Sequence, residues 1–269
     1  MTSKEERVEE YTLDRTLSNL GTRTIGRYAR WHATLPSTND LAMDLIKIPV
    51  PEGTVIVAEE QTAGRGRMGR TWASPRGGIW LSAILRPGLP LARVPLIGLA
   101  AAIAAARAIR ETTRLLARVK WPNDVMIDGR KVVGILLETA PDAEWIVIGI
   151  GVNANIAPGA LPVRTGFPAT SLEAILGHPV DRGALLRALL QGLDRGYERL
   201  RSGEVTPTLS AWREMSETLG HPVRVELPDG VVDGVAEDIE DTGALLVRRG
   251  DGTLAKVFAG DVGVAEAAR

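Results

Sequence analysis

Four short apolar runs follow one another closely between residues 118 and 153, and they restrict the fold more than any other part of the chain. The runs span residues 118–121, 125–128, 132–139 and 145–153. The breaks between them are short turns such as Asp128-Gly129. Strands joined by such turns pair antiparallel, because a parallel connection needs a crossover of about a dozen residues or more. The pattern therefore predicts a mixed, largely antiparallel sheet and excludes a doubly wound one.

Patterns on either side of these runs complete an α/β (α+β) domain. β-Branched and apolar runs predict further strands at residues 27–33, 54–59 and 79–85. Apolar residues three to four apart predict helices at residues 38–48, 95–116, 171–176, 181–201 and 206–219. The helix at 95–116 is apolar, but Arg107 and Arg110 leave its uncharged part shorter than the roughly 20 residues that a bilayer requires. We interpret it as a buried helix and expect no membrane partner.

The pattern changes after Gly220, where four to five short strands follow within about fifty residues separated by Gly-containing turns. This spacing predicts a small C-terminal β-barrel of SH3 type. We therefore divide the chain into a catalytic domain, residues 1–219, and an SH3-like domain, residues 220–269. Within the first, residues 1–25 form an N-terminal extension, in which Leu13, Leu17 and Leu20 suggest one short helix.

Composition limits the chemistry. The 269 residues include no cysteine, which excludes disulfides, thiolate nucleophiles and cysteine-ligated metals. His32, His178 and His221 are far apart, so we predict no histidine metal site. The net charge of -1 argues against nucleic-acid binding by the whole surface. The first residues contain no apolar run that would form a secretory signal, so we expect a cytoplasmic protein.

A segment rich in glycine and arginine, residues 62–72, is the strongest candidate for a binding loop. It contains three arginines, and residues 61–110 as a whole contain eight arginines and no Asp or Glu. Glycine frees the backbone, and guanidinium groups suit phosphate and carboxylate oxygens. The segment predicts a flexible loop that binds an anion. The alternative is a solvated surface loop whose arginines only keep it soluble.

The loop partly matches two nucleotide-binding signatures, but the residues that follow it do not fit either one. Gly64, Gly66 and Gly69 spell G-x-G-x-x-G after a predicted strand. The residues that follow cannot open a helix, however, and no acid lies about twenty residues further on. The P-loop signature fails because no Lys-Ser or Lys-Thr ends the glycine run.

Other segments contain candidate site residues, and each has a purely structural alternative. Residues 37–39 (Ser-Thr-Asn) are of the types that cap helices, and Gln61 stands where a strand ends. Residues 120–124 (Lys-Trp-Pro-Asn-Asp) predict an extended bend at a sheet end. Lys131 lies at the mouth of a buried strand, where a lysine either snorkels or acts on a ligand.

Together these strings resemble one family. They are, in chain order, Ser37-Thr38-Asn39, residues 60–72, residues 120–125, residues 130–136 and Gly149-Ile150-Gly151-Val152-Asn153. Over residues 27–262 their order and spacing are similar to those of biotin protein ligases, also called holocarboxylase synthetases. The resemblance implies a class II synthetase-like catalytic domain and an SH3-like barrel. It also implies an enzyme that makes biotinyl-AMP from biotin and ATP, then transfers biotin to a lysine of a biotin carboxyl carrier domain.

The resemblance implies a role for each matching residue. Those implied to bind biotin are Ser37, Thr38, Asn39, Gln61, Arg65, Gly66, Arg67, Trp72 and Lys131. Those implied to bind the nucleotide are Arg65, Arg67, Lys120, Asn123, Lys131 and Asn153. Arg65, Arg67 and Lys131 are the catalytic candidates, because biotin's carboxylate and the α-phosphate repel each other unless cations neutralise them. We expect Mg²⁺ on the nucleotide phosphates and not in a metal site of the chain.

The chain departs from the family pattern in two places. Members that double as repressors carry an N-terminal winged-helix domain that this sequence lacks, so we expect no sequence-specific DNA binding. Met68 stands where some members have arginine, which removes one phosphate contact. The oligomeric state stays open between a monomer and a homodimer.

Two rival functions remain. A lipoate or octanoyl ligase or transferase shares the fold, although the Gly-Arg-Gly-Arg loop and the terminal barrel favour biotin. A nucleic-acid-binding module could use the arginine loop and the small barrel as contact surfaces, and salt-dependent binding to DNA or RNA would favour that alternative.

Overall fold

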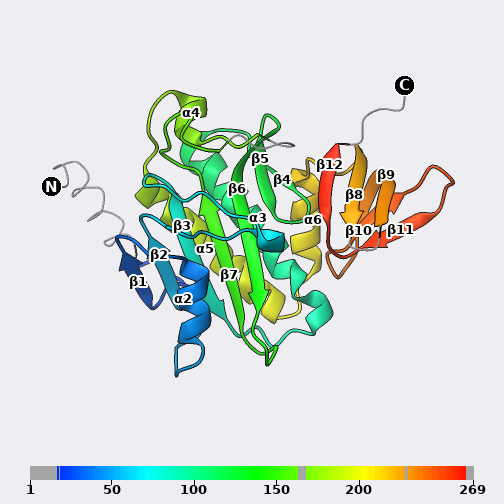
Figure 1. The fold of residues 1–269 in the computed structure, drawn as a ribbon. Coiled ribbons are helices and arrows are strands. Elements are labelled where there is room, and N and C mark those ends of the chain that lie inside the picture. The colour runs from blue at the N-terminus through cyan, green and yellow to red at the C-terminus, as the bar shows by residue number, and fades with distance from the viewer. Residues whose placement is uncertain (1–16, 18, 163–167, 228–229, 265–269) are drawn as a thin grey trace.

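The first part of the protein is organised around a seven-stranded sheet (Figure 1). The computed structural model describes residues 17, 19–162, 168–227 and 230–264. The strand order is β1-β2-β3-β7-β6-β5-β4. The strands are β1 Ala29–His32, β2 Val55–Ala58, β3 Ile79–Leu85, β4 Arg118–Lys120, β5 Asp124–Ile127, β6 Arg130–Thr139 and β7 Ile146–Val152. Among these named strands β1 and β2 pair parallel and the other neighbours antiparallel, which confirms the predicted mixed sheet.

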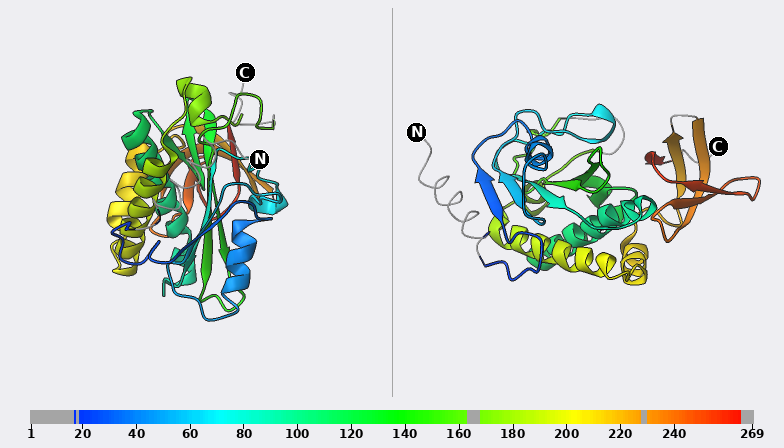
Figure 2. Two further views of the ribbon diagram at one scale, coloured as in Figure 1. Left: turned by 90° about the vertical axis from the view of Figure 1, so that its left-hand side faces the viewer. Right: turned by 90° about the horizontal axis from the view of Figure 1, so that it is seen from below.

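Helices cover the sheet unequally, and this leaves one face for a site. The helices are α2 Thr38–Leu45, α3 Pro95–Thr113, α4 Leu172–Leu176, α5 Arg182–Arg201 and α6 Thr206–Met215. Figure 2 shows α3, α5 and α6 together on one side of the sheet and α2 on the other. Two short 3₁₀ turns, η1 Arg67–Gly69 and η2 Leu91–Arg93, lie in the connections.

Helix α3 is the buried helix that its composition predicts. Leu91–Thr113 is the one described helical segment long and apolar enough to cross a membrane, and 78% of its apolar window is buried in the fold. It packs closely on α5, because Gly192 and Gly196 leave room for Ala104 and Ala100 of α3. A Cβ added at either glycine would lie 3.2 or 3.3 Å from an alanine Cβ. The small residues of the two helices therefore set their close approach.

The C-terminal part forms a second, five-stranded sheet, in which every pair is antiparallel. Its order is β11-β10-β9-β8-β12. The strands are β8 Pro222–Leu227, β9 Gly230–Ile239, β10 Leu245–Arg248, β11 Leu254–Val257 and β12 Asp261–Val264. Figure 1 shows this sheet beside β4 and α6. The small all-β unit expected after Gly220 is confirmed, while the division at residues 219/220 stays a prediction.

Polar contacts join the two sheets at β4. Trp121 Nε1 donates to the Gly243 carbonyl at 3.0 Å, and Lys120 Nζ donates to the Val262 carbonyl at 2.8 Å. Because Lys120 and Trp121 are consecutive residues, these two hydrogen bonds fix the bend after β4 against the second sheet.

Some predicted boundaries are too long. Helix α3 ends at Thr113 and not at 116, because Arg114 adopts a left-handed backbone conformation with φ of 65°. Helix α6 ends at Met215 and not at 219, because Ser216 is extended and begins the approach to β8. The short helix predicted from Leu13, Leu17 and Leu20 lies for the most part outside the described residues.

Candidate active site

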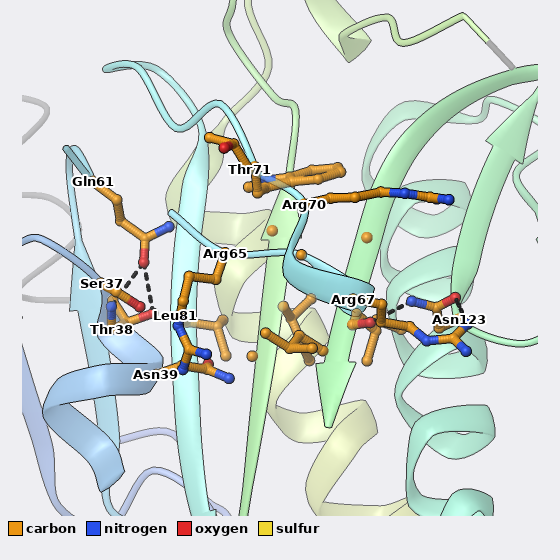
Figure 3. Close-up of a pocket in the computed structure, with 18 of the residues that line it drawn as sticks. Ser37, Thr38, Asn39, Gln61, Arg65, Arg67, Arg70, Thr71, Leu81 and Asn123 are labelled. Atoms are coloured by element: carbon orange, nitrogen blue, oxygen red, sulfur yellow. Dashed lines mark hydrogen bonds between the residues drawn. The ribbon is translucent and has the colours of Figure 1, made fainter. Parts of the chain in front are cut away.

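A pocket opens on the face of the sheet opposite α3 and α5, and it encloses about 740 Å³ of solvent-connected space (Figure 3). Helix α2, the arginine loop and strands β5, β6 and β7 contribute to its wall. Ten of the predicted site residues line it: Ser37, Thr38, Asn39, Gln61, Arg65, Gly66, Arg67, Trp72, Asn123 and Lys131. With Gly149, Ile150 and Gly151, which also line it, the fold thus gathers five separate sequence strings around one cavity.

Glycines form the floor of the pocket. Gly134 of β6 pairs directly with Gly151 of β7, and Gly149 lies two residues before Gly151 on the same strand. A Cβ on Gly151 would lie 2.4 Å from Trp72 Nε1, and one on Gly134 would lie 2.8 Å from the Trp72 ring. A Cβ on Gly149 would lie 2.2 Å from Asn39 Oδ1. The glycines of the Gly-Ile-Gly string therefore make space for the residues above them.

One end of the pocket is a network of neutral hydrogen-bonding groups. Gln61 Oε1 accepts from the backbone N–H and the hydroxyl of Thr38 at 2.8 and 3.0 Å. Gln61 Nε2 donates to Ser74 Oγ at 2.8 Å (Figure 3 shows Gln61 above Thr38). Ser37 also fulfils the capping role that its residue type suggests, because its hydroxyl accepts from Asp40 N at the start of α2. Several polar groups are thus oriented before any ligand arrives.

The buried Asn39 extends this network to β3 and β6. Its Oδ1 accepts from Ser82 Oγ at 2.5 Å, and its Nδ2 donates to Glu138 Oε2 at 2.8 Å. Ser82 also bonds to the Thr38 hydroxyl at 2.7 Å. The amide of Asn39 therefore has both of its ends engaged.

The arginine loop is a small hairpin in this structure. Gly66 N donates to Arg70 O at 2.7 Å, and Trp72 N donates to Gly64 O at 2.8 Å. A Cβ on Gly64 would lie 2.4 Å from the Trp72 carbonyl oxygen, so this close pairing requires glycine. Met68 has φ of 55° and is 66% exposed at the tip. The loop places Arg65, Arg67 and Trp72 along one edge of the pocket.

The other end of the pocket carries cations. Arg67 Nη1 donates to Asn123 Oδ1 at 3.1 Å, and the Gly260 carbonyl lies 3.4 Å away (Figure 3). Lys131 Nζ lies 2.6 Å from Asp124 Oδ1 and 5.1 Å from the centre of the Trp72 ring. Two positive charges therefore stand at one end, where negative oxygens would be attracted.

A β-bulge in β6 directs Lys131 into the pocket. Val125 of β5 pairs with Val133, whereas the next residue, Met126, pairs with Lys131, so Val132 has no counterpart. An extra residue shifts the alternation of side chains by one, which places Lys131 on the face of Gly134. Lys131 Cε lies 3.3 Å from the Cβ that Gly134 would carry.

Two predicted nucleotide-binding residues do not line this pocket. Lys120 is buried and donates to Val262 O at the junction of the two sheets. Asn153 is buried behind Lys131, where its Nδ2 donates to Thr170 O at 3.0 Å. Thr170 N in turn donates to the Lys131 carbonyl at 3.0 Å. Asn153 therefore supports the segment that pairs with Lys131.

Three acids at the pocket are absent from the sequence-based set: Asp40, Asp124 and Glu138. Asp124 ends one string that was already singled out, and Asp40 directly follows another, so their position was the available signal. Glu138 had no such signal, because only the register of β6 places it on the same face as Gly134, two strand periods away.

Comparison with known proteins agrees with this geometry. A family model described as the biotin/lipoate A/B protein ligase family matches residues 31–153, and one described as the biotin protein ligase C-terminal domain matches residues 218–263. The bifunctional ligase/repressor BirA of Bacillus subtilis is 36% identical over 247 residues, 90% of this chain and 76% of the relative. The biotin--[acetyl-CoA-carboxylase] ligase of Paracoccus denitrificans is 35% identical over 80% of this chain and 92% of its own.

A solved structure extends the likeness to three dimensions. Biotin protein ligase from Aquifex aeolicus, in complex with biotin and ATP, superposes with a TM-score of 0.78 at 27% identity. The likeness covers 88% of this chain and 97% of that one. The fold and the pocket thus define a protein ligase of the biotin and lipoate class. More narrowly, the chain belongs to the biotin protein ligase family, which confirms the family that its motifs predict.

Proposed function

We propose that this protein activates biotin with ATP and transfers it to a lysine of a biotin carboxyl carrier domain. In the first step a biotin carboxylate oxygen attacks the α-phosphorus of ATP, and pyrophosphate leaves. In the second, the acceptor amine attacks the acyl carbon of biotinyl-5'-AMP, and AMP leaves. The observation that supports this most is a single pocket with neutral hydrogen-bonding groups at one end and cations at the other.

The residues of the pocket fit the two parts of the substrate. A ureido ring has both donors and a carbonyl acceptor, which Ser37, Thr38, Asn39 and Gln61 can match. The first step brings two anions together, and Lys131 and Arg67 stand where they can neutralise both. Lys131 is our first choice for stabilising the transition state.

The loop is proposed to protect the intermediate. A mixed anhydride hydrolyses in open water, so the adenylate needs a cover. Gly66 and Trp72 are in the hairpin that edges the pocket, and Trp72 supplies an apolar wall over the glycine floor. Nucleotide contacts by Asn123 are supported by its place in the pocket, whereas Lys120 and Asn153 would act only from behind it.

Magnesium is proposed to enter with the nucleotide. No group of three or more His, Cys, Asp or Glu side chains that could hold a metal ion occurs among the described residues. Phosphate oxygens would therefore supply most of the ligands, as they do for Mg²⁺ in many nucleotide sites. The acceptor would be the carrier domain of a biotin-dependent carboxylase, and we propose a cytoplasmic location.

The test is exchange of labelled pyrophosphate into ATP, measured with and without biotin. Exchange that depends on biotin supports the proposal. Parallel reactions with lipoate and octanoate decide between this function and the related ligases, because the same pocket would have to accept an acid without a ureido ring. Exchange with lipoate and none with biotin would contradict the proposal.

A further inference from the structure

The guanidinium of Arg65 is already paired with two carboxylates of the same chain. Arg65 Nη1 and Nη2 donate to Glu138 Oε1 and Oε2 at 2.9 and 2.8 Å, in the paired geometry of a bidentate ion pair. Asp40 Oδ1 lies 2.6 Å from the same Nη2. Arg65 comes from the loop, Asp40 from α2 and Glu138 from β6. The contacts of Arg65 with Asp40 and Glu138 therefore tie the base of the loop to two separate walls of the pocket.

Glu138 has a second task that reaches the neutral end of the pocket. Its Oε2 also accepts from Asn39 Nδ2 at 2.8 Å, so both of its oxygens receive N–H donors. The other end of the Asn39 amide is held by Ser82. Glu138 thus fixes which way the amide of Asn39 points. If the amide were flipped, its oxygen would face the carboxylate oxygen of Glu138, and two acceptors repel each other.

Lys131 is held much less firmly. It makes one ion pair with Asp124 Oδ1, an oxygen that has no aligned hydrogen bond among the described residues. An arriving phosphate or carboxylate would compete at Lys131 with the carboxylate of Asp124 alone, because the other contact of this ammonium among the described residues is with the neutral ring of Trp72. At Arg65 it would compete with three contacts from two carboxylates. The charge of Lys131 is therefore available to a substrate, while that of Arg65 is committed within the protein.

We propose that Glu138, assisted by Asp40, is a positioning residue for biotin, and that Arg65 acts as the tie between these acids and the loop rather than as a phosphate ligand. The inference rests on the proposed function, because it takes the neutral end of the pocket as the place of the ureido ring. Glu138 touches Asn39 and Arg65 and acts through them. This gives Arg65 a different task from that of Arg67 and Lys131.

The deciding variant is Glu138→Gln, which keeps the shape of the side chain. A carboxylate only accepts, whereas the amide would set an N–H against a donor of Asn39 or Arg65. We expect the KM for biotin in pyrophosphate exchange to rise about tenfold, the scale of one lost charge-assisted hydrogen bond. The KM for ATP and kcat at saturating biotin should change by less than about twofold. Glu237→Gln is the matched control, because Glu237 makes a bidentate pair with Arg248 on the C-terminal sheet.

A second variant, Arg65→Lys, distinguishes between two roles of Arg65: the tie to Glu138 and Asp40, and direct binding of phosphate. Lysine keeps the charge but loses the two-pronged geometry. If Arg65 is the tie, the KM for biotin rises as in Glu138→Gln, the KM for ATP stays, and the double variant is no worse than either single one. A raised KM for ATP with an unchanged KM for biotin in either variant would overturn the inference, and so would additive effects.

The same assay separates this inference from the proposed function. If the wild-type protein shows no biotin-dependent exchange, the proposed function fails first. If wild type is active and both variants keep the wild-type KM for biotin, only the positioning role fails. Thermal unfolding of each variant is recorded alongside, and if Glu138→Gln folds poorly, Arg65→Lys and Asp40→Asn give the answer.

Discussion

The two ends of the pocket are built in different ways. At the neutral end, Thr38, Asn39 and Gln61 are buried or half-buried and each is fixed by at least two hydrogen bonds. At the cationic end, Lys131 has one ion pair, and Arg67 is carried on a hairpin. One end is set before the substrate arrives, and the other can exchange its partners.

This difference fits a reaction in which recognition and chemistry occur at opposite ends of one small molecule. A neutral ring is recognised best by groups that need no reorganisation, because each unpaired polar group would cost affinity. Charge stabilisation is most useful where charge develops, so it should become strongest in the transition state. Variants at the two ends should therefore change different kinetic constants.

The largest effect is expected at the cationic end. Lys131→Ala should lower the rate of adenylate formation by roughly two to three orders of magnitude, the typical cost of removing one preorganised charge stabiliser. The equilibrium affinity for biotin alone should fall by a smaller factor, because the hydrogen bonds of the neutral end are untouched. Single-turnover adenylation and direct binding measure the two quantities. Near-normal turnover would remove Lys131 from the mechanism.

The next effect tests the neutral end through its floor. In Gly149→Ala the new Cβ would lie 2.2 Å from Asn39 Oδ1, so the amide must move. Overpacking of this kind costs about 1–3 kcal/mol, and we expect the KM for biotin to rise at least about tenfold. The KM for ATP should stay near wild type. Gly98→Ala on α3 is the control, because a Cβ there meets nothing within 4 Å. Equal effects of the two changes would remove the link to Asn39.

A smaller effect is expected where the loop closes. Arg67→Ala removes the hydrogen bond to Asn123 and the contact with Gly260, and biotinyl-AMP should leave about tenfold faster, as for the loss of one charged hydrogen bond. A chase of labelled adenylate measures this rate. Met68→Ala, in the exposed tip beside it, should not change release. Unchanged release from Arg67→Ala would exclude it from the cover.

The smallest effect lies outside both ends and concerns stability. Burial raises the pKa of Glu217 above the usual carboxyl range, although Arg118 and Lys120 act to lower it. A raised pKa means that the folded state favours the protonated acid, so this group's contribution is present at low pH and is lost as pH rises through the folded pKa. Glu217→Gln should therefore stabilise the protein by less than about 1 kcal/mol near neutral pH, and not in acid. Denaturant unfolding at both pH values measures this, and neither KM should move.

Most of the fold could be predicted because local signals agreed with the tertiary structure. The turns between residues 118 and 153 forced antiparallel neighbours, and the strands and helices lie where their periodicity placed them. The ends of α3 and α6 were missed for a local reason. Arg114 adopts a left-handed conformation that residue type does not announce, and Ser216 leaves the helix to join β4 by a bridge to Val119.

The site was predicted less evenly. Ten of the predicted site residues do line one pocket, because the strands that carry them end or cross at the same place. Asn153 and Lys120 point elsewhere, since the face on which a side chain lies depends on register and on contacts with the second sheet. Glu138 could not be found from sequence at all, because its partner Arg65 is 73 residues away.

Val132 is an extra residue with no counterpart in β5, so the number of residues between Lys131 and Gly134 decides which face of the sheet carries the ammonium group. If one further residue were inserted between Lys131 and Gly134, the ammonium group would turn toward the helices while every amino acid of the catalytic set remained present, whereas deletion of Val132 would remove the bulge and leave Lys131 on the face of Gly134. With the insertion, activity would be lost because the lysine lies on the wrong face of the sheet, although the lysine itself is still present. Relatives with one extra residue at this point should be regarded as suspect catalysts even when their lysine is intact.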